Sequence, residues 1–444
     1  MRPGKRILPL LTGFVCLVLA AAAYSEPEAK STAKKPSWLQ LSFEQRTRFE
    51  TLTNPFRFKE SGTERFSPLR TRLKLELGEA GKPVRFLVEF QDSRGFLDNR
   101  DLFSTSSHVN KNDFLQLQIQ LNSKNFLRRK LESSLIAGRF TVDLGKRRLV
   151  ARNGMRNTTN AFDGVLWSLA GDSKWKVQTF FTSPVIIDPE KLDSGSFNRY
   201  FWGIYFESSH FKRFRTETYY FGLRENNRTS TQRRHSTIGL RVYKKPAAGK
   251  VDFEVESAWQ FGSTKAQDHF SHLQHGEVGF SFNSRWNPRL SSQFDYAEGD
   301  DSPQDKHSRR FNTLYGARSF EYTPTGIFGP FYRSNLSSPG VRVVFNPVKT
   351  LEFTVSQRAF WLARAKDAWV GSGLLDSSGK SGLSLGQNLE TCIRWRPRSF
   401  FLLEAGYSRF FKGSYLDRVS GSPRTGDSNY FYIATEIRGR LLPY

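Results

Sequence analysis

The chain has 444 residues, a formal net charge of +25, 14% aromatic residues and 25% charged residues. Its mean hydropathy is −0.53, and beyond the first two dozen residues no stretch resembles a transmembrane helix. A soluble protein would fit that hydropathy but would not explain so many aromatic residues beside so many charges. A transmembrane β-barrel explains both, because each of its strands is apolar on one face and polar on the other.

The first 37 residues are predicted to lie outside the folded domain. Arg2, Lys5 and Arg6 precede an apolar run, Ile7–Ala23, which small residues close. This order is typical of a cleaved signal peptide, and the run is shorter than the roughly 20 apolar residues that a spanning helix needs. We predict a signal peptide over residues 1–25, a polar linker over 26–37 and a barrel over 38–444. Cleavage leaves one cysteine, Cys392, which excludes an internal disulfide and a thiolate metal site.

Strict alternation of apolar and polar residues recurs along the whole chain. Leu69–Leu77 is an example, with leucine and threonine at one parity and arginine, lysine and glutamate at the other. Alternation of this kind places one set of side chains on each face of a strand. We count about eighteen such segments, beginning near Leu39, Leu69, Val84, Leu115, Ser133, Phe162, Trp175, Tyr200, Arg215, Ser236, Val251, His275, Arg289, Asn335, Leu351, Leu385, Phe401 and Phe431.

The connections between these segments alternate in length. Short ones, such as 78–83 and 396–398, are followed by long ones, such as 141–161 and 299–334. Bacterial outer-membrane barrels have an even number of antiparallel strands, short periplasmic turns and long extracellular loops. A soluble sandwich or propeller has no reason to keep its long loops at one end. The sequence therefore predicts an all-β transmembrane barrel of about 18 strands in the outer membrane of a Gram-negative-type bacterium, with both termini in the periplasm.

The inward-facing positions of this barrel are predicted to be basic. By parity, we expect the lumen to contain Arg46, Arg48, Arg70, Arg72, Lys74, Arg85, Arg241, Arg358, Arg394 and Arg438. Arg139, at a strand end, and Arg148 and Arg152, in the connection 141–161, are expected there as well. Arg94 and Arg409 are further candidates at strand ends. Such a lumen would concentrate anions, and dispersed arginines would bind carboxylates through bidentate pairs while still releasing them. The alternative is structural: outward basic residues would pair with lipopolysaccharide phosphates, and inward ones with glutamates across the lumen.

The connection 141–161 carries five basic residues against one acid, Asp143. It is expected either to be a solvated loop or to fold into the pore mouth as a selectivity gate. Catalytic and nucleotide-binding motifs are not recognisable, so we predict neither an enzyme nor a cofactor. His269, His272 and His275 are expected at a turn, and their spacing matches no known metal signature, so no metal site is predicted.

Several short stretches stand in one order along the chain: Ala137–Arg139, Leu144–Val150, Asn157–Val165, Phe294–Asp300, Phe311–Tyr315, Phe360–Ala363 and Gly406–Ser408. Together they resemble the alginate-export-type family of outer-membrane proteins, in the right order and over about residues 40–440. The resemblance implies an eighteen-stranded barrel with an arginine-lined pore through which a secreted polyuronate leaves the cell. Phe140, Gly154 and Asn160 depart from the family pattern, which leaves the substrate open.

Three functions remain in competition at this stage. The first is a passive channel for an anionic saccharide, such as the polyuronate alginate. The second is a general porin for small anions, and the third is a structural or adhesive barrel with a plugged lumen. Expected partners are the anionic polysaccharide or small anions, outer-membrane lipid and lipopolysaccharide, the barrel assembly machinery and a periplasmic export partner. Nucleic acid is not expected.

Overall fold

The computed structural model describes residues 38–79, 81–100, 102–128, 130–196, 198–226, 232–302, 304–319 and 321–442. The predicted signal peptide over 1–25 and linker over 26–37 lie outside the described residues. In the part of the chain that is described, no helix is long and apolar enough to cross a membrane.

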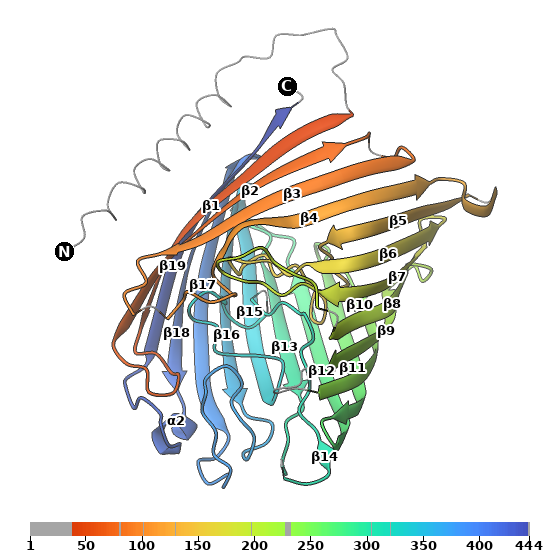
Figure 1. The fold of residues 1–444 in the computed structure, drawn as a ribbon. Coiled ribbons are helices and arrows are strands. Elements are labelled where there is room, and N and C mark those ends of the chain that lie inside the picture. The colour runs from red at the N-terminus through yellow and green to blue at the C-terminus, as the bar shows by residue number, and fades with distance from the viewer. Residues whose placement is uncertain are drawn as a thin grey trace.

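Eighteen antiparallel strands form one closed barrel, because β1 pairs with β19 as well as with β2 (Figure 1). The short β14, His307–Ser308, lies within a connection and pairs in parallel with β12. Two short helices, η1 (Phe126–Arg128) and α2 (Ser414–Arg418), also lie in connections. The wall strands are β1 Leu39–Thr53, β2 Thr63–Leu77, β3 Val84–Phe96, β4 Asn110–Ser123, β5 Leu131–Phe140, β6 Phe162–Gly171, β7 Trp175–Pro184, β8 Arg199–Ser208, β9 Arg215–Asn226, β10 Gln232–Lys244, β11 Lys250–Thr264, β12 Gln267–Ser281, β13 Arg289–Ala297, β15 Leu336–Val348, β16 Leu351–Trp361, β17 Ser384–Arg398, β18 Phe401–Lys412 and β19 Ser428–Leu442.

The barrel has a terminus end, where β1 begins and β19 ends, and a loop end opposite it. At the terminus end, residues 349–350 and 399–400 suffice to reverse the chain, whereas 298–335 and 362–383 connect strands at the loop end. This is the predicted alternation. Two connections at the loop end depart from it, since only residues 227–231 separate β9 from β10 and only residues 265–266 separate β11 from β12.

Strand β12 begins at Gln267 rather than near His275, so the expected turn around its histidines is wrong. His269 and His275 are buried toward the lumen, whereas His272 has the opposite parity and contacts the outward Trp259 at a ring-centroid distance of 5.0 Å. The three histidines therefore lie along one strand on two different faces and do not converge.

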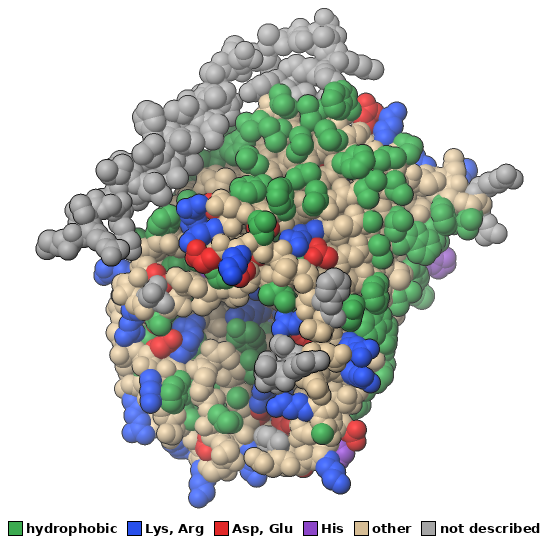
Figure 2. All heavy atoms as spheres, viewed as in Figure 1, with side chains coloured by type: hydrophobic (Ala, Val, Ile, Leu, Met, Phe, Trp, Pro, Cys, Tyr) green, Lys and Arg blue, Asp and Glu red, His purple; other side chains and the backbone are tan. Residues whose placement is uncertain are grey.

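The two faces of the wall differ as the alternation predicts. On β11, Val255 and Trp259 are exposed on the outside, whereas Glu256 and Gln260 are buried inside. Figure 2 shows the outward hydrophobic side chains gathered over the upper flank, where Figure 1 places β3 to β9. Below this flank the surface is hollowed, and basic side chains surround the hollow. An apolar belt of this kind faces lipid in a transmembrane barrel.

Candidate functional site: the lumen and its two inward segments

Two connections from the loop end fold back into the barrel. The first inward segment is residues 141–161, between β5 and β6, and the second is residues 309–335, between β13 and β15. A parallel bridge joins them at Val150 and Tyr315, and the backbone N–H of Tyr315 donates to the Leu149 carbonyl at 2.9 Å. At Gly316 an added Cβ would collide with the Arg148 carbonyl oxygen, so the close approach of the two segments requires glycine.

Arginines of the wall hold the first inward segment by its backbone. Arg46 donates from Nη1 to the Gly154 carbonyl at 2.6 Å, and Arg48 donates from Nη1 to the Met155 carbonyl at 2.7 Å. Arg70 donates to the Gly154 carbonyl at 3.2 Å. A guanidinium has five donors in a fixed fork, so it can bind a carboxylate and a carbonyl together. These three residues, all predicted for the lumen, are therefore first of all positioning residues.

A buried ion-pair network holds both inward segments against the other side of the wall. Arg148 is buried and pairs with Glu254 at 2.5 Å, with Glu321 at 2.5 Å and with Glu256. Glu321 belongs to the second inward segment and also pairs with Arg333. Arg148 therefore connects the two segments to β11. Its pairs must be kept, because a buried charge is tolerated only when it is paired.

Carboxylate and imidazole atoms of Glu254, His275 and Glu321 lie within 4.8 Å of one another, a spacing that could suit a metal ion. Arg148 pairs with both glutamates, however, and the His275 Nδ1 lies 2.8 Å from Asp295 Oδ1. Arginine already provides the positive charge that a cation would supply. The cluster is therefore explained by ion pairing.

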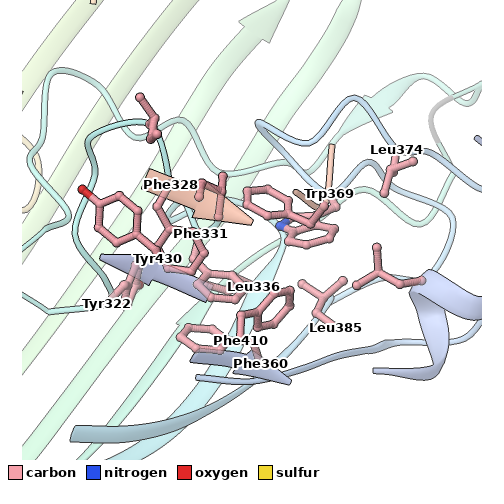
Figure 3. Packing of buried hydrophobic residues seen from close by; sticks show 14 of the residues in the cluster. Tyr322, Phe328, Phe331, Leu336, Phe360, Trp369, Leu374, Leu385, Phe410 and Tyr430 are labelled. Carbon is pink, nitrogen blue, oxygen red and sulfur yellow. The ribbon is translucent and has the colours of Figure 1, made fainter. Parts of the chain in front are cut away.

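Aromatic packing completes the interior on the loop side. Phe331 of the second inward segment stacks on Phe360 of β16 with ring centroids 3.4 Å apart (Figure 3). Trp369, from the connection 362–383, joins the same cluster and donates from its indole nitrogen to the Pro330 carbonyl at 2.9 Å. The second inward segment thus has an apolar core of its own against the inner wall, which the polar-lumen prediction did not foresee.

The inward segments separate two cavities. Residues 152–156 of the first inward segment line both cavities. Asn153 and Arg156 line the loop-side cavity, whereas Arg152, Gly154 and Met155 line the terminus-side cavity. In the second segment, 316 and 318 face the loop side while 317 and 319 face the terminus side. A solute that crosses the barrel must therefore pass the two segments.

The terminus-side cavity has a volume of about 1210 Å³ and is lined by both charges. Its arginines have carboxylate neighbours: Arg438 approaches Glu44 at 3.3 Å, and Arg394 pairs with Glu404 at 2.6 Å. The predicted residues that line it are Arg46, Arg48, Arg70, Arg72, Lys74, Arg152, Arg394 and Arg438, beside the acids Glu44, Glu89, Asp143, Glu352, Glu390, Glu404 and Glu436.

The loop-side cavity has a volume of about 490 Å³, and none of its described lining residues is acidic. Its arginines are Arg57, Arg156, Arg199, Arg318 and Arg333. Arg156 donates to Asn160 Oδ1 at 2.7 Å, and the Arg318 guanidinium lies 3.2 Å from the centroid of the Tyr332 ring. Burial and the neighbouring Arg318 charge lower the pKa of Arg156 to about 10, so it stays charged at neutral pH.

Five predicted site residues lie outside both cavities, and four of them face inward. Arg85 pairs with Glu76 at 2.9 Å near the terminus end, and Arg241 pairs with Glu217 at 2.7 Å in a third cavity. Arg148 and Arg358 are buried in the ion-pair network, Arg358 against Asp295 at 2.6 Å.

The expectation for Arg139 needs correction. It shares a face with the exposed Leu135 and pairs with Asp163 at 2.8 Å, on the outside of the wall. Arg94 and Arg409 likewise point outward, paired with Asp92 and Asp427. Each of the three has the same parity as an exposed apolar residue of its strand, Phe86, Leu135 or Tyr407, so strict alternation would have placed them outside.

Sequence reasoning did not single out Arg57, Arg199, Arg318 or Arg333. A signal for the last two was present in the second inward segment, whose aromatic content is too high for a solvated loop. Phe311, Tyr322, Phe328 and Phe331 are all buried there. Aromatic residues need a partner surface, and for a connection at the rim of a barrel the nearest one is the inner wall.

Comparison with known proteins agrees with this architecture. A family model described as alginate export matches residues 37–427, and no curated protein sequence matches the chain. Among solved structures, Pseudomonas aeruginosa OpdL is similar with a TM-score of 0.61 at 12% identity, covering 91% of this chain and 99% of that one. OccK2 (OpdF) of the same organism gives 0.61 at 11% identity, covering 93% and 100%. OpdQ, also from that organism, gives 0.59 at 13% identity, covering 91% and 98%. At this identity the structures show the fold alone. Family and fold together place the protein in the Gram-negative outer membrane and support a passive channel rather than an enzyme.

Proposed function

This chain belongs to the alginate export family, and we propose that it is a passive outer-membrane channel for an anionic saccharide, with a polyuronate such as alginate as the substrate. The observation that carries the proposal is the loop-side cavity, whose described lining holds five arginines and no acid. Arg57, Arg199 and Arg333 pair with glutamates that do not line it, whereas Arg156 and Arg318 do not. Any solute that crosses the barrel meets this cavity next to the inward segments.

The chemistry of the cavity suits carboxylates on a sugar chain. Arg156 and Arg318 make no ion pair with a described residue, so their charge is available to a passing anion. Guanidinium groups bind carboxylates in planar bidentate pairs, and Tyr315 and Tyr332 line the same cavity. Several separate arginines allow a polymer to exchange one contact for the next, which transport requires.

A general porin for small anions is the second candidate. A cavity of about 490 Å³ with five arginines would also admit single carboxylates. Polymer length distinguishes the two, because only a polymer can occupy both cavities at once and interrupt the ionic current.

The test is conductance in planar lipid bilayers with purified protein. We expect anion selectivity, and we expect micromolar to millimolar polyuronate to interrupt the current, whereas neutral dextran of equal length does not. Anion selectivity with no interruption by polyuronate would identify the small-anion porin. Cation selectivity would contradict the basic path, and zero conductance would identify a plugged barrel.

A further inference from the structure

Two outward-facing arginines lie directly opposite each other at the loop end of β9 and β10. Arg224 and Arg234 are cross-strand partners, and both side chains are exposed. Their neighbours Leu223 and His235 are buried on the lumen side, which fixes the outward direction of the arginines. Tyr200 of β8 is the cross-strand partner of Arg224 on the same outward face.

This pair has no carboxylate partner among the described residues. Glu225, the nearest acid in sequence, points inward and pairs with Arg233 at 3.0 Å. The connection 227–231 reads Asn-Arg-Thr-Ser-Thr, which adds one arginine and no acid. Like charges directly opposite each other on adjacent strands are destabilising, so this arrangement calls for an anion from outside the chain.

Three other outward arginines at the loop end have acidic partners, whereas Arg65 of β2 has none among the described residues. Arg94 pairs with Asp92 at 2.8 Å, Arg409 with Asp427 at 3.1 Å and Arg139 with Asp163 at 2.8 Å. The pair on β9 and β10 therefore differs from these three arginines, and the paired arginines provide matched controls.

Below the arginines, toward the middle of the wall, lies an outward aromatic shelf. The Phe181 ring is 5.8 Å from that of Tyr200 and 6.5 Å from that of Trp202. Trp202 lies against Gly222, where an added Cβ would collide with the indole. Aromatic rings of this kind lie at the headgroup level of membranes.

Aliphatic side chains follow the shelf on the same face. Ile204 is 45% exposed, Ile238 46% and Leu240 48%, so they form an apolar surface for acyl chains. The order along the wall is thus positive charge, aromatic rings and then aliphatic residues.

We propose that this face of β8–β10 binds a phosphorylated glycolipid of the outer leaflet. Its phosphate would lie between Arg224 and Arg234, its sugars against Tyr200 and Trp202, and its acyl chains along Ile204 and Ile238. The paired guanidinium groups match phosphate geometry. The apolar surface below them selects a lipid over free phosphate. This site does not depend on the proposed channel function.

The proposal is tested by native mass spectrometry of the full-length protein in detergent, titrated with hexa-acyl lipid A bearing two phosphates. We expect the parent to retain lipid A, and Arg224→Gln with Arg234→Gln to weaken retention by roughly tenfold for each arginine removed. The control variant, Arg94→Gln with Arg409→Gln, should bind as the parent does. Dephosphorylated lipid A should bind weakly to all three proteins.

Two results would overturn the proposal. One is equal retention of lipid A by the parent and the Arg224/Arg234 variant. The other is displacement of lipid A by millimolar inorganic phosphate, which would show that the arginines bind free anions and that the aliphatic surface contributes nothing. Both variants carry outward substitutions at a strand end, and a heat-shift gel checks that each barrel is folded.

Discussion

The two cavities of the lumen are both rich in arginine, yet their arginines have different partners. In the terminus-side cavity, Arg394 and Arg438 have glutamate neighbours, and Arg46 and Arg70 bind backbone carbonyls. In the loop-side cavity, Arg57, Arg199 and Arg333 also pair with glutamates. Arg156 and Arg318 have only neutral acceptors among the described residues. The number of arginines in a lumen therefore does not measure its attraction for anions. What matters is how many of them lack a protein anion.

The largest effect on conductance and stability is expected from the ion-pair network that holds the inward segments between the two cavities. Replacing Arg148 with Met leaves Glu254, Glu256 and Glu321 buried without their shared partner, which costs about 3–5 kcal/mol for a broken buried ion pair. The inward segments should loosen, so single-channel conductance should rise and become noisy. The urea midpoint of unfolding should fall with it.

Arg394→Met is the matched control for this change. The Arg394 side chain is 53% exposed and pairs with Glu404, so its loss should cost only about 0–1 kcal/mol. Equal effects of Arg148→Met and Arg394→Met on conductance and on unfolding would show that the network does not hold the inward segments.

A smaller effect is expected on ion selectivity. Changing Arg156 and Arg318 to Gln should lower the anion-to-cation permeability ratio by roughly two- to fivefold, because both charges face the path without protein anions. Changing Arg394 and Arg438 to Gln should lower the permeability ratio less. The glutamates left without a partner would repel anions, but they line the wider cavity, where an anion can pass farther from them. Reversal potentials measure both ratios.

The salt dependence of selectivity tests the same prediction. At 1 M salt the screening length is about 3 Å, so the two double variants should converge with the parent. A larger loss of selectivity from the Arg394/Arg438 variant would reverse the comparison between the cavities.

The smallest effect concerns carboxylates crowded on the outside of the wall. In the connection 185–198, Asp193 accepts from Asn110 Nδ2 at 2.8 Å and lies beside Asp113. Burial, with the neighbouring Asp113 charge, raises the pKa of Asp193 to about 7. A raised carboxyl pKa means that stability is fully present below the ordinary value of about 4 and is lost as pH rises through about 7.

We therefore expect amide hydrogen exchange in residues 185–196, corrected for its intrinsic pH dependence, to show more protection at pH 6 than at pH 8. Asp193→Asn should remove this difference, because the amide carries no charge at either pH. Persistence of the difference in that variant would assign it to another group.

The strand pattern was predictable because it depends on local alternation alone. The predicted starts at Leu39, Phe162 and Leu351 coincide with the observed ones. The start of β12 was missed by eight residues, since His269 and Ser271 inside and Asp268 and His272 outside leave only Phe270 to mark the apolar face. Where the outward face carries both polar and apolar side chains, the two-residue alternation cannot be recognised in the sequence.

The candidate site could be predicted only in part. Arg148 was assigned to the lumen, but its partners are 108 and 173 residues away in the chain, and no local pattern brings Glu256 and Glu321 to it. The same holds for Arg46 and the Gly154 carbonyl, which are 108 residues apart. A sequence shows which side chains face inward, but their pairing depends on how the interior is filled.

The joint between the inward segments also sets an order of events in biogenesis. Tyr315 bridges to Val150, which lies 165 positions earlier in the chain, and Glu321 pairs with Arg148, 173 positions earlier. Contacts so distant in sequence form slowly, because the intervening chain must first be arranged. The seam of the barrel is more distant still, since β1 pairs with β19 at Thr47 and Thr435. We therefore expect the two inward segments to meet before the ring closes, so that a wide, undivided pore need not form during assembly.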